Sequence, residues 1–346
     1  MDQDRSDAHV GSARQRLRLE DVAARVGLSA ATVSLVLRNA PGPSGETRRR
    51  VLEAADELGY RPNRTASLLA RRRTHLLGVV LEVRNSFHAE LVEDLQAVSE
   101  HGDYELVLST VTRTRDERRA VESLLDFRCE ALILLGPEAP PARLAALGRQ
   151  LPLIAVGRRV TADGVDVVRA ADDEGVAQAV EYLASLGHQA IAYVDGGRGV
   201  IAGDRLRGYR DATRRQGLAG GRRIIAGDHT EESGVHAAAT LLRERDLPTA
   251  VLTFNDRCAL GLLDAFHRAG IDVPGSVSVV GYDDSPLARL AHVNLTTVSQ
   301  NTQQQAEHVM AAAVERLDEG RSVSREVVLS PRLVLRDTVG LPRSSA

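Results

Sequence analysis

The stretch "GLSAATVSLVLRN", residues 27–39, has the spacing of a short helix that starts directly after a tight turn. Gly27 can take the left-handed backbone of such a turn, and the Ser29 hydroxyl can cap the first free N–H groups. Beyond the cap, the larger apolar residues fall on one side at helical period, at Val33, Val36 and Leu37. The other side then holds Ala30, Ala31, Ser34 and Leu35. The stretch therefore predicts a helix with one buried face and one uncharged outer face.

Further helices are expected on both sides of this stretch. Residues 19–25 form a short amphipathic segment, with Val22 and Val26 four residues apart. Downstream, Ser44 can cap a third helix that Gly59 can end. The apolar residues of this third segment recur at helical spacing, at Val51, Ala54, Ala55 and Leu58. Two short helices joined through a glycine-containing turn predict a helix-turn-helix, whose second helix enters the DNA major groove. A three-helix bundle without a nucleic-acid partner is the alternative.

The charge distribution favours the DNA-binding interpretation. All 44 basic residues are arginine, and residues 1–75 hold 14 of them against nine acidic residues. The rest of the chain holds 30 arginines against 38 acidic residues, so a basic head precedes an acidic body. Such asymmetry indicates that only the N-terminal part of the chain binds a polyanion such as DNA. So small an excess of positive charge is also compatible with an ordinary solvated surface.

The composition excludes several classes of protein. With 346 residues, 43% of them hydrophobic, the chain can form two or three domains with real cores. The N-terminus has no apolar export signal, and no run is long enough to span a membrane. The two cysteines, Cys129 and Cys258, have neither metal-ligand spacing nor a disulfide framework. We therefore expect a cytoplasmic protein without a metal or cofactor.

Beyond Thr74, near-continuous apolar runs alternate with helical segments. The first series is "LLGVVLEV", "YELVLSTV", "ALILLG" and "LPLIAVG", and the second is "AIAYVDG", "RIIAGD", "AVLTFND" and "VSVVGYDD". Such runs between amphipathic helices indicate parallel sheets that are covered on both faces. Two series predict two doubly wound α/β subdomains, and ligands of such sheets bind beyond the carboxyl ends of the strands.

Four stretches carry a resemblance to a known family. They are "LEDVAARVGLSAATVSLVLRN", "ETRRRVLEAADELGYRPNRTASLLA", "VVGYDDSPLA" and "LTTVSQ", and they closely resemble the LacI/GalR family of bacterial transcriptional regulators. The resemblance runs from about Arg18 to about Asp337. It implies a helix-turn-helix headpiece, a hinge helix, and a periplasmic-binding-protein-like core that binds a small-molecule effector and works as a homodimer or tetramer.

The resemblance also implies boundaries along the chain. We expect a disordered tail at 1–17, the headpiece at 18–62, the hinge helix and linker at 63–74, and the core at 75–340. Within the core, the N-subdomain is expected at about 75–170 and 300–329, and the C-subdomain at about 171–299 and 330–340.

Expected DNA contacts come from the second helix and from the hinge. They are Ser29, Ala30, Ala31, Thr32, Ser34, Leu35, Arg38, Asn63, Arg64, Ala66 and Leu69. Residues 63–70 are too few to hold as an isolated helix, so we expect one that folds only on DNA, the alternative being a flexible linker. Leu69 matches the family's leucine that wedges between central base pairs. Ala30, Ala31 and Leu35 cannot hydrogen-bond to bases but can pack on thymine methyl groups.

Expected effector contacts follow the ends of predicted strands. The family motifs match Arg205, Asn255 and Asp283, and a weaker candidate is Gln300. Guanidinium, amide and carboxylate together suit a polyhydroxyl ligand, whereas a purely structural Arg–Asp pair is the alternative. From the other half of the pocket we expect Asn85, Phe87 and Arg158, with Phe87 or Phe254 as the stacking surface for a sugar.

This second half departs from the family pattern. Asn85-Ser86-Phe87-His88 stands where Asn-Pro-Phe-Phe is common, and Gly157 followed by Arg158 stands where an Asp often follows the fourth strand. Ala171 occupies the place of another usual Asp, with Asp172 displaced by one residue. The identity of the effector is therefore open, with a sugar or sugar derivative as the family expectation.

The sequence thus predicts a ligand-responsive repressor, bound as a homodimer to a pseudo-palindromic double-stranded operator and released by a sugar-like effector. The alternative is a corepressor-dependent regulator that senses a nucleobase or another non-sugar metabolite. A solute-binding protein would need an export signal and would lack the head. An enzyme would need a nucleophile–base set or a metal cluster, and the scattered histidines and adjoining Asp283 and Asp284 form neither.

Overall fold

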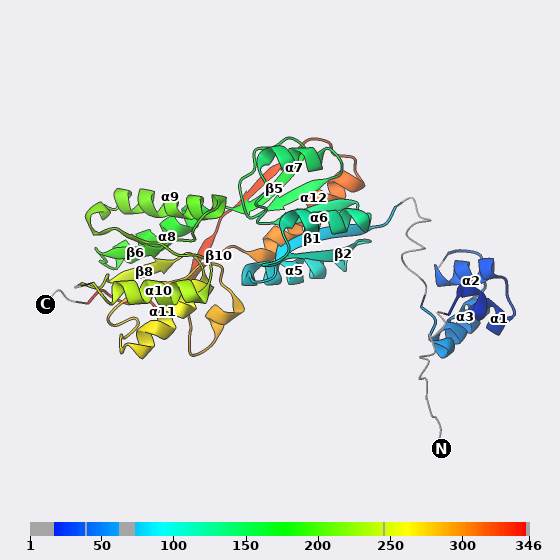
Figure 1. Ribbon diagram of the computed structural model, residues 1–346, viewed down its shortest axis with the longest axis horizontal. Coiled ribbons are helices and arrows are strands. Elements are labelled where there is room, and N and C mark those ends of the chain that lie inside the picture. The colour runs from blue at the N-terminus through cyan, green and yellow to red at the C-terminus, as the bar shows by residue number, and fades with distance from the viewer. Residues whose placement is uncertain (1–16, 39, 62–72, 245, 344–346) are drawn as a thin grey trace, which may run out of the picture. The chain divides into compact units, whose positions relative to one another are not determined.

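The computed structural model describes residues 17–38, 40–61, 73–244 and 246–343. The chain divides into two compact units, residues 1–73 and 74–346, which are taken in turn (Figure 1). The expected hinge contacts Asn63, Arg64, Ala66 and Leu69 lie outside the described residues, as does the tail up to residue 16.

The first unit contains the three predicted helices. They are α1 (Leu19–Val26), α2 (Ala30–Leu37) and α3 (Gly45–Leu58), and they pack around Val22, Val33 and Val51, which are fully buried. Gly27 has a φ of 68° between α1 and α2, so it makes the left-handed turn that the sequence predicted. The helix-turn-helix arrangement is therefore confirmed.

The second unit begins with a six-stranded parallel sheet, which forms the N-subdomain. Its strand order is β11-β5-β4-β3-β1-β2. The bounds are β1 (Leu76–Glu82), β2 (Glu105–Val111), β3 (Ala131–Leu135), β4 (Leu153–Val156), β5 (Val165–Ala170) and β11 (Glu326–Leu329). Helices α5 (Ser86–Ser99) and α12 (Thr302–Leu317) share one apolar cluster with alternate residues of β1, β3 and β4. Helices α6 (Glu117–Asp126) and α7 (Pro141–Gly148) bury Leu124 and Leu144 beside the sheet.

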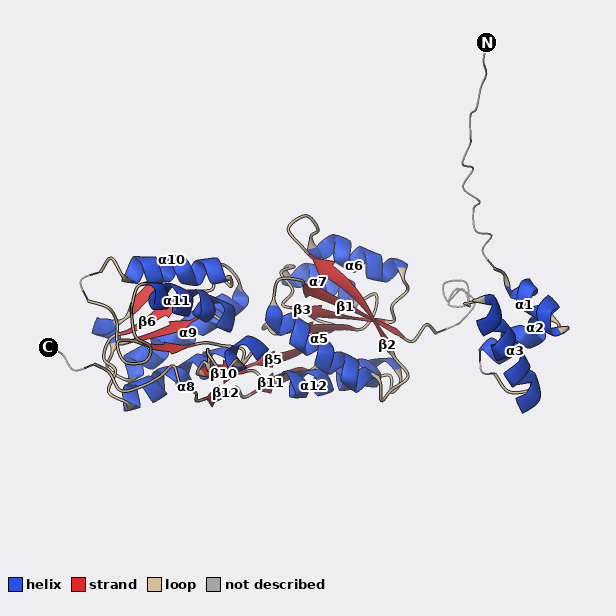
Figure 2. Cartoon of the chain, turned by 90° about the horizontal axis from the view of Figure 1, so that it is seen from below, coloured by secondary structure: helices blue, strands red, loops and turns tan. Residues whose placement is uncertain are grey.

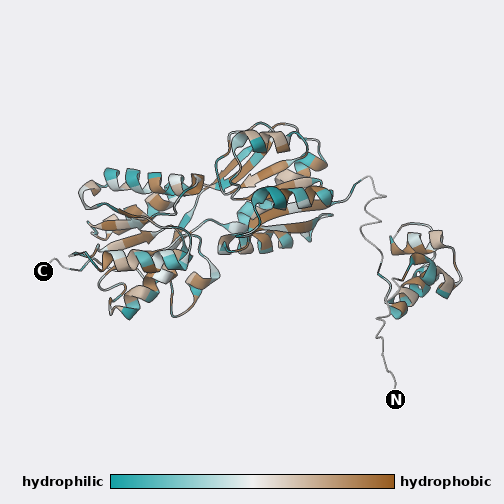
Figure 3. Cartoon of the chain, viewed as in Figure 1, coloured by the Kyte–Doolittle hydropathy of each residue, from teal (hydrophilic) through white to brown (hydrophobic). Residues whose placement is uncertain are grey.

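The C-subdomain has a four-stranded parallel sheet in the order β7-β6-β8-β9. The strands are β6 (Ile191–Val194), β7 (Arg223–Ile225), β8 (Ala250–Thr253) and β9 (Ser278–Val280). Helices α8 (Asp172–Ser185) and α9 (Val200–Arg215) pack on one face, whereas α10 (Glu231–Leu241) and α11 (Asp256–Arg268) pack on the other (Figure 1). Figure 3 shows the strands of both sheets in the brown of hydrophobic residues, as expected for sheets that are covered on both faces. The prediction of two α/β subdomains is confirmed.

The chain passes between the subdomains three times. It crosses after β5, after β10 (Thr297–Ser299), and after β11, beyond which β12 (Arg332–Val334) pairs antiparallel with β10 (Figure 2).

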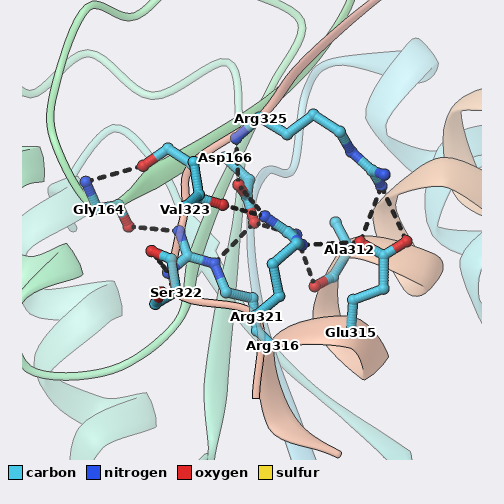
Figure 4. A network of polar contacts seen from close by, with 10 residues as sticks. Gly164, Asp166, Ala312, Glu315, Arg316, Arg321, Ser322, Val323 and Arg325 are labelled. Atoms are coloured by element: carbon cyan, nitrogen blue, oxygen red, sulfur yellow. Dashed lines mark hydrogen bonds and ion pairs between the residues drawn. The ribbon is translucent and has the colours of Figure 1, made fainter. Parts of the chain in front are cut away.

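A buried carboxylate helps to fix the returning chain in the N-subdomain. Asp166 of β5 accepts hydrogen bonds from Arg316 at 3.0 Å, from Arg321 at 2.8 Å and from the backbone N–H of Arg325 at 2.7 Å (Figure 4). The three donors lower the pKa of Asp166, although burial raises it. The pairing joins α12 and the start of β11 to β5 and so holds β11 in register.

Candidate functional site

The outer surface of α2 is the first candidate site. The Ser29 hydroxyl accepts a hydrogen bond from the Thr32 N–H at 3.1 Å and lies 2.9 Å from the Thr32 hydroxyl, so both side chains serve the start of the helix. Ala31 is exposed, and Ser34 and Leu35 are half-buried. Arg38 is exposed and its Nε donates to the Ser34 carbonyl at 3.2 Å.

The position of Ala30 differs from the expectation. Ala30 packs against the headpiece core together with Leu37, because residues 30, 33 and 37 share one helical face. The expected outer face of α2 therefore narrows to Ala31, Ser34 and Leu35.

Arg205 is the centre of the second candidate site, at the carboxyl end of the C-subdomain sheet. Its side chain is only 4% exposed, and its Nε donates to Oδ1 of Asp172 at 2.7 Å. The Nη1 group donates to the Phe254 carbonyl at 2.6 Å. The guanidinium carbon lies 3.6 Å from the ring centroid of Tyr282 and 4.6 Å from that of Phe254. Arg205 is therefore held rigidly by a carboxylate, a carbonyl and two aromatic faces.

Asp283 and Gln300 lie beside this guanidinium. Gln300 Nε2 donates to Oδ1 of Asp283 at 2.7 Å, and Arg205 Nη2 lies 3.7 Å from the same oxygen. Burial raises the pKa of Asp283, against the opposing effect of Arg205. Oδ2 of Asp283 has no hydrogen-bond partner among the described residues. The cluster can accept a hydrogen bond from a ligand hydroxyl at this oxygen.

Asn255 has a local role in the structure. It caps α11, since its Oδ1 accepts from the Cys258 N–H at 2.9 Å, and its Nδ2 donates to the His229 carbonyl at 3.1 Å. One lone pair and one amide hydrogen remain for a ligand.

The carboxyl end of β1 and the start of α5 form the part of the N-subdomain that faces the C-subdomain. Asn85 caps this helix by accepting from the Phe87 N–H at 3.1 Å. The Phe87 ring packs in the N-subdomain core and is 7% exposed, so it does not offer the stacking face that was expected. His88 accepts from the Glu82 N–H at 3.0 Å through Nδ1, and burial lowers its pKa to about 4.

Direct contacts join the N-subdomain to the C-subdomain. His229 Nε2 lies 3.6 Å from Oε1 of Glu82, and Arg257 donates to the Arg84 carbonyl. A Cβ built on Gly157 would lie 3.8 Å from Cδ1 of Ile201, at the start of α9. The strand ends of the N-subdomain therefore face the start of α9 and the loop after β7.

The comparisons with known proteins identify the family. A model of bacterial regulatory proteins of the lacI family matches residues 18–63, and a periplasmic binding protein-like domain matches residues 180–339. The transcriptional regulator GalR of Escherichia coli K12 is 34% identical over 334 residues, which cover 95% of this chain and 97% of GalR. The chain belongs to the LacI family. It is a DNA-binding transcriptional regulator.

Solved structures of LacI-family proteins agree with this assignment. A LacI transcriptional regulator from a Rhodococcus species is 42% identical, with a TM-score of 0.75 over 77% of this chain and 99% of that chain. The lac repressor dimer bound to operator and the anti-inducer ONPF is 29% identical, with a TM-score of 0.78 over 94% of this chain and 99% of that chain. Within the described part of this LacI-family chain, no helix has the length and apolar content needed to cross a membrane.

Sequence reasoning missed several residues around Arg205 and at the boundary between the subdomains. Asp172 was noted only as displaced, yet it forms the closest ion pair of Arg205, from the first turn of α8. Tyr282, Glu82 and His229 were not singled out, because their roles depend on partners far away in the sequence. The first turn of α8 holds three consecutive acidic residues, so the sequence alone did not distinguish Asp172 from Asp173 and Glu174.

Proposed function

We propose that this LacI-family regulator is a repressor, which binds a pseudo-palindromic operator as a homodimer and releases it when a small polyhydroxyl effector fills the cleft. The observation that carries the proposal is the cluster of Arg205, Asp172, Asp283 and Gln300. It combines buried donors and acceptors at the carboxyl ends of the C-subdomain strands, opposite the N-subdomain wall.

The coupling between ligand and DNA follows from the three crossovers. A ligand that contacts both subdomains favours one angle between them. It can change DNA binding only if it binds one conformation of the core more tightly than the other. The linker leaves the headpiece and enters the N-subdomain at β1, so a change in subdomain angle would act on the hinge residues 63–74. The solved structure of the lac repressor dimer, bound to both operator and the anti-inducer ONPF, supports this combination of ligands.

Asp283→Asn provides the test of the effector site. Asparagine keeps the size of the side chain and retains an acceptor for Gln300, and Arg205 stays paired with Asp172. Arg205→Ala would be a poorer test, because it leaves two buried carboxylates without their cation, a change that typically costs about 3–5 kcal/mol.

We expect Asp283→Asn to bind operator as tightly as the wild type and to lose its response to effector at least tenfold. Operator is obtained by selection from random double-stranded DNA, and release is followed by fluorescence anisotropy with a panel of sugars, sugar acids and sugar phosphates. Asp264→Asn, an exposed member of an i,i+4 ion pair on α11, is the matched control. Loss of operator binding by a folded, dimeric Asp283→Asn protein would show that Asp283 is structural, and no release of the wild type by any compound would count against a releasing effector.

A further inference from the structure

Arg158 is a buried cation that has no carboxylate partner among the described residues. It is 9% exposed, and its Nη2 donates to the Ala139 carbonyl at 2.9 Å. Its Nε is buried and has no acceptor among the described residues. The other two arginines that are buried to this degree in the described chain, Arg169 and Arg205, pair with carboxylates at 2.6 Å and 2.7 Å.

No carboxylate in the described part of the chain forms an ion pair with Arg158. Burial lowers the pKa of Arg158, and Glu117 and Glu138 oppose this shift from beyond ion-pair distance. Glu117 already accepts the backbone N–H of Glu138 at 2.6 Å. A buried charge is costly unless it is paired, so Arg158 is the kind of residue for which a ligand would supply the counter-ion.

Arg158 also lies where ligands of this fold are held. It follows Gly157, which has a φ of 86° at the carboxyl end of β4 and lies against Ile201 in the first turn of α9. This 16-residue helix has a glycine, Gly199, at its N-cap, so no N-cap side chain accepts a hydrogen bond from the first N–H groups. Its first turn also contains no acidic residue. Free N–H groups and the helix dipole give the start of α9 a positive potential, and Gly157, the residue before Arg158, lies against this turn.

We propose that the effector carries an anionic group, a phosphate or a carboxylate, and that Arg158 binds this group at the boundary between the N-subdomain and the start of α9. The inference rests on the proposed effector-binding function and deepens it. A guanidinium matches both anions with two parallel N–H groups, and Nε of Arg158 is free to be one of them. The neutral, hydroxyl-bearing part of the same ligand would then lie toward Asp283 and Gln300.

The first test uses simple anions and the full-length protein. Thermal unfolding of the wild type, Arg158→Gln and Arg118→Gln is compared in phosphate, sulfate and chloride at equal ionic strength. Arg118 is exposed in an i,i+4 pair with Glu122 and is the matched control. Ligand that binds the folded state alone raises its stability by mass action. We expect phosphate or sulfate to raise the melting temperature of the wild type and of Arg118→Gln by a similar amount, and that of Arg158→Gln by less than half as much. An equal rise in all three proteins, or none in the wild type, would overturn the proposal.

The same measurement separates a binding role from a structural one. Without multivalent anions, Arg158→Gln removes an unpaired buried charge, so its melting temperature should equal or exceed that of the wild type. A fall of several degrees would mean that Arg158 supports the loop at Ala139 and would overturn the proposal as well.

The second test identifies the source of the anion through operator release. Glucose, gluconate and glucose 6-phosphate, and the equivalent sets for other sugars, are titrated against the wild-type complex and the Arg158→Gln complex. We expect release only by an anionic member of a set, with an apparent affinity at least tenfold weaker for Arg158→Gln. Carboxylate or phosphate is then distinguished by which member acts. Equal release of both proteins by a neutral sugar would overturn the anionic subsite and leave the proposed repressor function intact.

Discussion

Glu90 of α5 is a carboxyl group at the boundary between the two subdomains. Its Oε1 is buried and has no hydrogen-bond partner in the described structure. Burial raises its pKa to about 7, Arg289 opposes the shift, and Asp256 and Asp284 of the C-subdomain add to it. Because the folded state holds this proton more tightly than the unfolded chain does, stability is full below the ordinary pKa of glutamate and falls as the pH rises from about 4.5 to about 7.

Glu90→Gln should therefore stabilise the core at alkaline pH. Glutamine imitates the protonated side chain, so we expect a gain of about 1–2 kcal/mol in the free energy of unfolding at pH 8 and almost none at pH 4.5. Denaturant unfolding at the two pH values measures the difference. Glu93→Gln, at an exposed position of the same helix, is the control. Equal effects of Glu90→Gln at both pH values would show that burial of its charge is not what matters.

At the scale of the element, α2 has few groups with which to read bases. The hydroxyls of Ser29 and Thr32 lie together at the helix start, and the outer face adds Ala31, Ser34 and Leu35. Leu35 is half-buried and does not belong to the described core of the headpiece. Such a surface suits contact with the C5-methyl group of thymine better than hydrogen bonding to guanine.

We expect replacement of thymine by uracil in the half-sites to weaken operator binding. One buried methyl group is worth about 0.8 kcal/mol, which corresponds to roughly a fourfold loss of affinity for each thymine that is contacted. Leu35→Ala should reduce the penalty of the uracil substitution, because it removes the partner of the methyl group. Fluorescence-anisotropy titrations of the wild type and Leu35→Ala with thymine-containing and uracil-containing half-sites measure both effects. DNA that carries uracil only in its flanking sequence is the control. An unchanged affinity for uracil-containing half-sites would rule out methyl recognition.

At the scale of the whole core unit, the subdomains are joined by contacts that depend on charge. His229 Nε2 and Glu82 Oε1 lie 3.6 Å apart across the boundary between the subdomains, and each side chain is about one-third exposed. The imidazole of His229 lowers the pKa of Glu82, and the Glu82 carboxylate raises the pKa of His229. The charged groups that act on the pair are Arg84 and His88 from the N-subdomain and Asp228 from the C-subdomain.

The pair should stabilise the contact between the walls at mildly acidic pH. Its contribution is present below the ordinary histidine pKa of 6.5 and is lost as the pH rises through the raised pKa of His229. On the acid side it is lost as the pH falls below about 4.5, through the lowered pKa of Glu82. We expect a coupling energy of about 0.5–1 kcal/mol at pH 6, which disappears at pH 9.

A double-mutant cycle measures this coupling. It combines Glu82→Gln with His229→Gln and compares free energies of unfolding at pH 6 and pH 9. Because the cycle cancels single-site effects, the titration of Glu90 does not contribute. A coupling of the same size at both pH values would exclude the charge of His229 as its source.

The sequence by itself determined the features that depend on neighbours along the chain. The helices of the headpiece follow from caps at Ser29 and Ser44 and from glycines at 27 and 59, all of which act within one or two turns. Eight of the ten strands of the two parallel sheets follow from apolar runs that a doubly covered sheet can bury, whereas β5 and β11 were not among the predicted runs. Family motifs brought Arg205, Asp283 and Gln300 into one predicted site, and the structure places them in contact.

Only the tertiary structure decided which groups are paired. Arg205 meets Asp172 across 33 residues of sequence, and Glu82 meets His229 across two subdomains. Asn255 caps its own helix, Phe87 packs in a core, and Arg158 has no carboxylate partner in the described part of the chain. The physical reason is that the energy of a polar or charged side chain depends on its burial and on what lies opposite, and both are fixed by contacts between elements distant in sequence.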